Sequence, residues 1–147
     1  MADHAIQTMV IAAPAERIRD VLVDFAAYPQ WANDLKGVTV ERTDADGLGR
    51  EVTFRAAAMG RSTSYTLAYE YGDDPITISW SLVRGDIMRR LDGSYTLEPV
   101  AGDPARTTVT YRLSVELIVP LPGFVKRRAE AKIVHTALRD LRDRVEA

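Results

Sequence analysis

Hydrophobic and polar residues in this chain follow a two-residue period through the middle and a helical period near both ends. Residues 5–12 alternate and are rich in β-branched side chains, which predicts a strand. Pro14 then suits the first turn of a helix, because its missing N–H group is not needed there. Pro29 disfavours helical backbone just before it and interrupts this run. We therefore expect a bend into a short second helix at 28–32, with Gly37 at its exit.

Six further strands are expected before the last quarter of the chain. Turns rich in Gly, Asp and Pro separate them, and such short turns favour an antiparallel meander over βαβ units. The second and third strands should form a hairpin about Gly60-Arg61. The six strands are predicted at residues 38–42, 51–59, 63–71, 76–82, 88–98 and 107–117.

One long amphipathic helix is predicted after these strands, running almost to Ala147. The strands must bury its apolar stripe, and a curved antiparallel sheet that closes around one helix leaves a hollow between them. The fold class is therefore α+β, and the hollow is the best lead to function. The apolar stripe consists of Phe124, Ala131, Val134, Leu138, Leu141 and Val145, at helical spacings of three, four and seven.

Length and charge narrow the range of functions. The 147 residues suit one domain spanning residues 1–147, and a net charge of −2 gives no general attraction to nucleic acid. No run approaches the roughly 20 apolar residues of a membrane-spanning helix, and the first five residues lack the features of a signal peptide. We therefore expect a soluble, cytoplasmic protein that is a monomer or a homodimer.

Several kinds of catalytic and cofactor site are not supported by the sequence. There is no cysteine, which excludes disulfides, thiolate metal ligands and cysteine nucleophiles. With His4 and His135 as the two histidines, no histidine-based zinc site is expected. Gly47-Leu48-Gly49 lacks the third glycine of a dinucleotide fingerprint. We therefore expect neither a metal nor a cofactor.

The positive signal is a set of aromatic residues on the inward faces of the strands. One interpretation is that each of them packs the core. As a set, however, inward tyrosines need partners for their hydroxyl groups, such as water, a polar neighbour or a ligand, and the pattern predicts a site for a hydrophobic small molecule. The predicted lining residues are Phe54, Tyr65, Tyr69, Trp80, Tyr95 and Tyr111, with Trp31, Met59, Met88 and Phe124 near the rim.

Two polar residues of the terminal helix are further candidates for this site. Arg127 lies within the apolar stripe and either reaches solvent or holds a ligand anion at the pocket mouth. His135 flanks the stripe and is either a structural histidine or a proton carrier. Lys126-Arg127-Arg128 place cations at the positive end of the helix dipole, where they serve solubility or meet an anionic partner such as lipid headgroups.

The order of elements and several motifs resemble the START-like (SRPBCC) superfamily, which has a helix-grip fold. The likeness covers nearly the whole chain and is greatest to the polyketide cyclase/dehydrase and coenzyme Q-binding branch. It rests on the motifs at 13–16, 25–31, 80–86, 92–99, 107–111 and 120–124.

This resemblance leaves three functions open, because one fold hosts unrelated activities. The first is a protein that binds a lipid, polyketide or quinone-like ligand between the sheet and the terminal helix. The second is an aromatase/cyclase in which Arg127 and Tyr65 polarise carbonyls and move protons. The third is a lipid or quinone chaperone that makes transient contact with a membrane through Leu121, Phe124 and the neighbouring cations.

Overall fold

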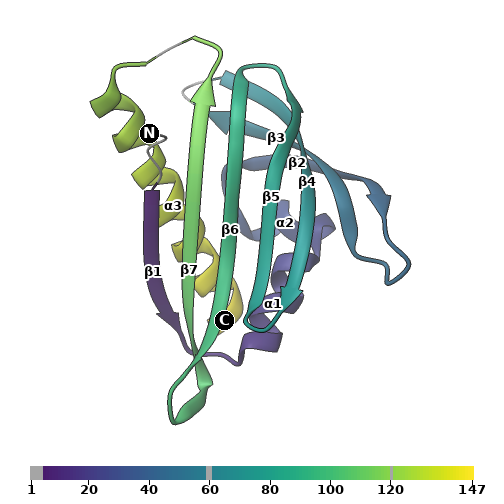
Figure 1. Cartoon of the computed structure of the whole chain (residues 1–147), viewed down its shortest axis with the longest axis vertical. Helices are drawn as coiled ribbons and strands as arrows, with labels where there is room; N and C mark the ends of the chain where they lie inside the picture. Colours follow the sequence, from purple (N-terminus) through teal and green to yellow (C-terminus); the bar gives the residue numbers. More distant parts are fainter. Residues whose placement is uncertain (1–4, 59–60, 120) are drawn as a thin grey trace.

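A strongly curved antiparallel sheet wraps around one long helix (Figure 1). The computed structural model describes residues 5–58, 61–119 and 121–147. Its elements are β1 (Ala5–Ile11), α1 (Ala15–Val23), the 3-10 helix η1 (Phe25–Ala27), α2 (Tyr28–Trp31), β2 (Leu35–Thr43), β3 (Gly49–Ala58), β4 (Arg61–Asp73), β5 (Ile76–Gly85), β6 (Met88–Val100), β7 (Asp103–Leu117) and α3 (Gly123–Glu146).

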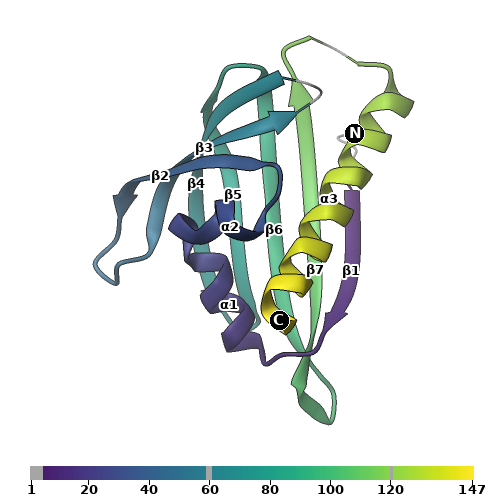
Figure 2. The ribbon, with the colours of Figure 1, turned by 180° about the vertical axis from the view of Figure 1, so that it is seen from behind.

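The sheet is a meander from β2 to β7, and β1 pairs with the last strand, giving the order β1-β7-β6-β5-β4-β3-β2. The three α-helices lie on the same, concave face (Figure 2). The expected α+β class and helix-grip arrangement are confirmed. The boundary at Gly37 is wrong, because β2 begins at Leu35 and Gly37 lies inside it. The last strand, β7, also begins earlier than expected, at Asp103. In the β3–β4 hairpin Ala58 pairs with Arg61, while Met59 lies outside the described residues.

The long helix α3 uses a narrower buried face than its sequence predicts. Val134, Leu138, Leu141 and Val145 are buried, and the helix packs along β1 and β7. Each such side chain contributes about 1.5–3 kcal/mol when it leaves water. Ala131 is exposed instead of completing this face. In the described part of the chain, no helix is both long and apolar enough to cross a bilayer.

Trp80 lies against the middle of the sheet because its cross-strand partner is a glycine. Trp80 in β5 pairs with Gly93 in β6. A Cβ atom at position 93 would lie 2.5 Å from the indole of Trp80 and 2.7 Å from the carbonyl oxygen of Arg112. No side chain fits there without moving the tryptophan or the neighbouring strand.

We expect Gly93→Ala to destabilise the protein by about 1–3 kcal/mol, the usual cost of overpacking. Gly72→Ala is a matched control in β4, where the nearest atom to a new Cβ would lie at an ordinary 3.6 Å. Urea denaturation of both variants measures the difference. An equal loss of stability in the two variants would contradict the close approach of Trp80 to Gly93.

Candidate functional site

A cavity of about 200 Å³ lies between the concave face of the sheet, α2 and α3. Its wall is mostly apolar, and an apolar cavity of about 150 Å³ in another protein holds benzene. The space therefore suits a compound of one or two rings. Eight residues proposed from the sequence line it together: Trp31, Phe54, Tyr65, Tyr69, Trp80, Met88, Tyr95 and Tyr111.

Three residues proposed from the sequence lie outside this cavity. Phe124 and Arg127 are exposed, because they belong to the first turns of α3, away from its buried stretch. His135 is also exposed and faces β1, where the side-chain amide of Gln7 lies 3.2 Å from its Nδ1 atom. The sequence left open whether Arg127 reaches solvent or a ligand, and in this structure neither Arg127 nor His135 lines the cavity.

The part of α3 that does face the cavity is a second line of residues beside the buried stripe. Ile133, Ala137 and Asp140 recur at spacings of four and three, and all three line the cavity. The buried carboxylate of Asp140 accepts hydrogen bonds from the backbone N–H of Asn33 at 3.2 Å and from its side-chain amide at 3.1 Å. This pair links the segment between α2 and β2 to the helix. In the sequence, the i, i+4, i+7 spacing of these three residues is the signal that could have identified this second line.

The aromatic rings of the cavity contact one another and fix its shape. Trp80 meets Tyr111 edge-on, with ring centroids 5.6 Å apart, and Tyr111 lies 4.6 Å from Tyr95. On the other side Trp80 lies 5.9 Å from Tyr69. Such pairs each add about 0.5–1.5 kcal/mol beyond the area they bury. The rings therefore form a preformed wall.

Five polar groups in this wall are hydrogen-bond donors without a protein partner. Among the described residues, the hydroxyl groups of Tyr65, Tyr69, Tyr95 and Tyr111 form no hydrogen bond, and the buried indole Nε1 of Trp31 has no acceptor. All five residues line the cavity. A buried donor without an acceptor, such as the indole N–H of Trp31, costs about 1–3 kcal/mol. The arrangement therefore favours a molecule that brings acceptor oxygen atoms.

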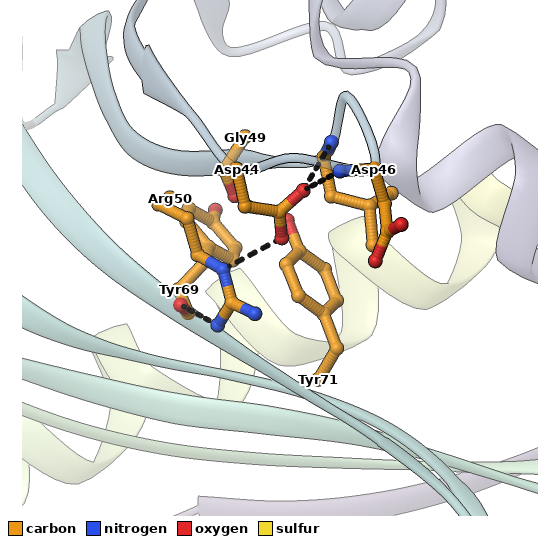
Figure 3. A network of polar contacts seen from close by, with 7 residues as sticks. Asp44, Asp46, Gly49, Arg50, Tyr69 and Tyr71 are labelled. Carbon is orange, nitrogen blue, oxygen red and sulfur yellow. Dashed lines mark hydrogen bonds and ion pairs between the residues drawn. The ribbon is translucent and has the colours of Figure 1, made fainter.

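The remaining tyrosines have partners. Tyr28 lines the cavity, but its hydroxyl donates to the carbonyl oxygen of Leu22. Tyr71 belongs to a network at the β2–β3 turn, where its hydroxyl donates to the carbonyl oxygen of Gly49 and the guanidinium of Arg50 lies over its ring (Figure 3). This network braces the turn outside the cavity.

An aspartate holds the other end of this network together. The carboxylate of Asp44 accepts from Arg50 Nε at 2.9 Å and from two backbone N–H groups of its own turn (Figure 3). Desolvation raises the pKa of Asp44, but these hydrogen bonds outweigh it and leave the pKa below its ordinary value. Asp44 is therefore a charged structural residue of the turn.

The six tyrosines share one electrostatic property. Each has a pKa above its ordinary value, mainly because burial disfavours the phenolate. For Tyr71 burial raises the pKa to about 12. At neutral pH the hydroxyl groups that line the cavity are therefore protonated donors.

The described residues contain no cluster of three or more His, Asp or Glu side chains that could hold a metal ion.

We expect no tyrosine of the folded protein to ionise near pH 10, the ordinary pKa of a tyrosine side chain. Above that pH the unfolded chain loses protons that the folded chain keeps, so the free energy of unfolding falls as the pH rises. Tyrosinate absorbance and circular dichroism, recorded on the same alkaline titration, measure this. Both signals should change together, and ionisation near pH 10 with the fold intact would contradict the burial of these hydroxyl groups.

Comparison with known proteins places this geometry in a family. Solved structures with the same fold include a START superfamily protein from Mycobacterium smegmatis, with 26% identity, a TM-score of 0.91 and 97% of both chains covered. Another is the ZhuI aromatase/cyclase from Streptomyces sp. R1128, with 14% identity, a TM-score of 0.84 and coverage of 99% of this chain and 94% of that one. A third is a STAR-related lipid transfer protein from Xanthomonas axonopodis, with 21% identity, a TM-score of 0.74 and coverage of 98% and 86%.

No curated protein matches the sequence. A family model described as polyketide cyclase / dehydrase and lipid transport matches residues 4–146. The match extends over almost the whole chain and agrees with the superfamily resemblance found in the sequence motifs. The protein therefore belongs to the polyketide cyclase / dehydrase and lipid transport family, within the START-like superfamily.

Proposed function

We propose that this protein binds a small, largely aromatic ligand that carries carbonyl or hydroxyl oxygen atoms, in the cavity between the sheet and α3. One observation carries the proposal: an apolar cavity contains four tyrosine hydroxyl groups and one indole N–H without protein acceptors. The family supports a hydrophobic ligand, since its description joins polyketide chemistry with lipid transport.

Two physical terms would stabilise such a complex. Burial of apolar ligand surface contributes about 25 cal/mol per Å². Each acceptor oxygen that reaches a cavity hydroxyl adds a hydrogen bond, worth about 0.5–1.5 kcal/mol. The hydroxyls of Tyr65 and Tyr111 are protonated at neutral pH, and the raised pKa of each keeps them so in alkaline solution, so both can donate to carbonyl oxygen atoms. The apolar term would set most of the affinity, and the donors would set the orientation.

The two tryptophans of the chain provide a direct assay, because both Trp31 and Trp80 line the cavity. 1,4-Naphthoquinone is a suitable probe, with two rings, two carbonyl oxygen atoms and the ability to quench indole fluorescence. Saturable quenching with one site per chain is expected. Naphthalene has the same two rings but no acceptor oxygen atoms. It should compete with naphthoquinone for the cavity only weakly. Quenching that never saturates would refute the proposed site.

We expect Tyr111→Phe to weaken naphthoquinone binding by about two- to tenfold, the value of one hydrogen bond, and to leave naphthalene binding unchanged. Tyr71→Phe is the matched control, because its hydroxyl group bonds to Gly49 outside the cavity. Fluorescence titration of both variants with both compounds measures the four affinities. Equal losses for the two compounds, or for the two variants, would contradict the role of the cavity hydroxyls as donors.

A second candidate function is cyclisation of a poly-β-keto chain, and the buried carboxylate of Asp140 favours it. In this reaction the carboxylate would take a proton from a methylene between two carbonyls, and the carbanion would attack a carbonyl carbon further along the chain. The oxygen of that carbonyl would receive a proton from a cavity tyrosine such as Tyr95, and loss of water would follow. Supporting the idea, Asp140 and Tyr95 line the same cavity.

The cyclase hypothesis is tested by adding the protein to a minimal polyketide synthase and identifying the ring pattern of the products. Catalysis predicts a changed product ratio that Asp140→Asn abolishes, while naphthoquinone still binds to that variant. An unchanged product ratio with the unsubstituted protein would leave binding as the function.

A further inference from the structure

One end of the molecule exposes a group of large apolar side chains. Ile118 is 52% exposed, Val119 72% and Phe124 63%. They lie where β7 ends and α3 begins, two elements that meet at the same end of the fold (Figure 2). Isolated exposed apolar residues are ordinary, but three within seven positions on one tip mark an interaction surface.

Cations follow these apolar residues in the sequence. Residues 118–133 contain four Lys and Arg residues and one glutamate, which gives this segment a charge of +3 within a chain of net charge −2. The glutamate, Glu130, is buried and lies 3.7 Å from the amine of Lys126. Arg127 and Arg128 are exposed and form no ion pair with any described residue. Since cations oppose the helix dipole at this end, helix stability does not explain them.

A second hollow lies beneath the same turns of α3. It has a volume of about 90 Å³, and Leu121 and Lys126 contribute to its wall. It shares Met88, Val115 and Ile133 with the main cavity, so the two spaces adjoin. These three shared side chains are what separates the second hollow from the ring-lined cavity.

We propose that this tip, formed by Ile118, Val119, Phe124, Arg127 and Arg128, docks on an anionic lipid bilayer. The apolar side chains would enter the boundary between headgroups and acyl chains, while the two arginines would contact phosphate groups. The second hollow would then open beside the membrane and provide the route by which the ligand reaches the cavity. The docking stands by itself, whereas this route rests on the proposed function.

The chemistry of the tip favours a bilayer over other partners. Two copies of this chain would bring their positive segments together and repel each other. A nucleic acid would use the cations but would offer no apolar phase for Val119 and Phe124. An anionic membrane satisfies both features at once, because its charged surface covers an apolar interior.

Sedimentation with lipid vesicles tests the proposal. The protein should bind vesicles that contain phosphatidylglycerol, bind far less to pure phosphatidylcholine, and detach as salt is raised. Arg127→Ala/Arg128→Ala should weaken binding by about 25-fold, from about fivefold per cation. Arg106→Ala/Arg139→Ala is the matched control, because it removes the same charge from two exposed arginines outside the tip and should change binding less than twofold.

Phe124→Ser should weaken vesicle binding about tenfold, the value of one aromatic side chain leaving water. Val10→Ser is the control, since Val10 is 42% exposed on β1, outside the tip. Because all these side chains are exposed, circular dichroism should show intact folds.

Three results would overturn the docking surface: no binding to anionic vesicles, equal binding to neutral vesicles, or a protein dimer that Phe124→Ser dissociates. The naphthoquinone titration separates this proposal from the proposed function. Arg127→Ala/Arg128→Ala should bind the quinone from solution normally. Vesicle binding by a protein that does not bind the quinone would leave the docking in place and refute only the ligand route.

Discussion

Packing of α3 against β1 and β7 is the interaction on which the remaining architecture depends. Four fully or nearly fully buried aliphatic residues, from Val134 to Val145, hold the C-terminal half of the helix. The sheet must curve to reach this helix, and the curvature separates the middle strands from it. The cavity is the space that this separation leaves, and the aromatic rings of β3 to β7 only partly fill it.

The cavity wall combines rigid packing with unmet hydrogen-bonding capacity. Its rings contact one another directly, and Gly93 lets Trp80 approach the sheet so closely that the indole has little room to turn. At the same time the wall leaves several hydroxyl groups and the indole N–H of Trp31 without acceptors. A core selected for stability alone would pair these groups or replace them with apolar ones. Their presence is the physical reason to regard the space as a binding site.

The sequence predicted this wall well because strand alternation is a local property. Tyr65 and Tyr69 point inward simply because every second residue of β4 does. It could not decide the place of Arg127, which has the phase of the buried stripe but lies in the first turns of α3, where the helix face is exposed. Helical periodicity gives the direction of a side chain and says nothing about what covers it. Asp140 was missed for a related reason. A helix can bury two adjoining faces, and in the sequence a face that carries a charged residue resembles one exposed to solvent.

The hydrogen bonds between Asn33 and Asp140 have a kinetic consequence. They tie the segment that precedes β2 to α3, and both elements belong to the wall of the cavity. This side of the wall can widen only when these hydrogen bonds break, so the rate at which the cavity adapts to a larger guest depends on this pair. Affinity and the rate of adaptation would then be governed by different residues. Donors deep in the cavity would determine how tightly a guest is held, and one amide–carboxylate pair would determine how fast the wall gives way to it.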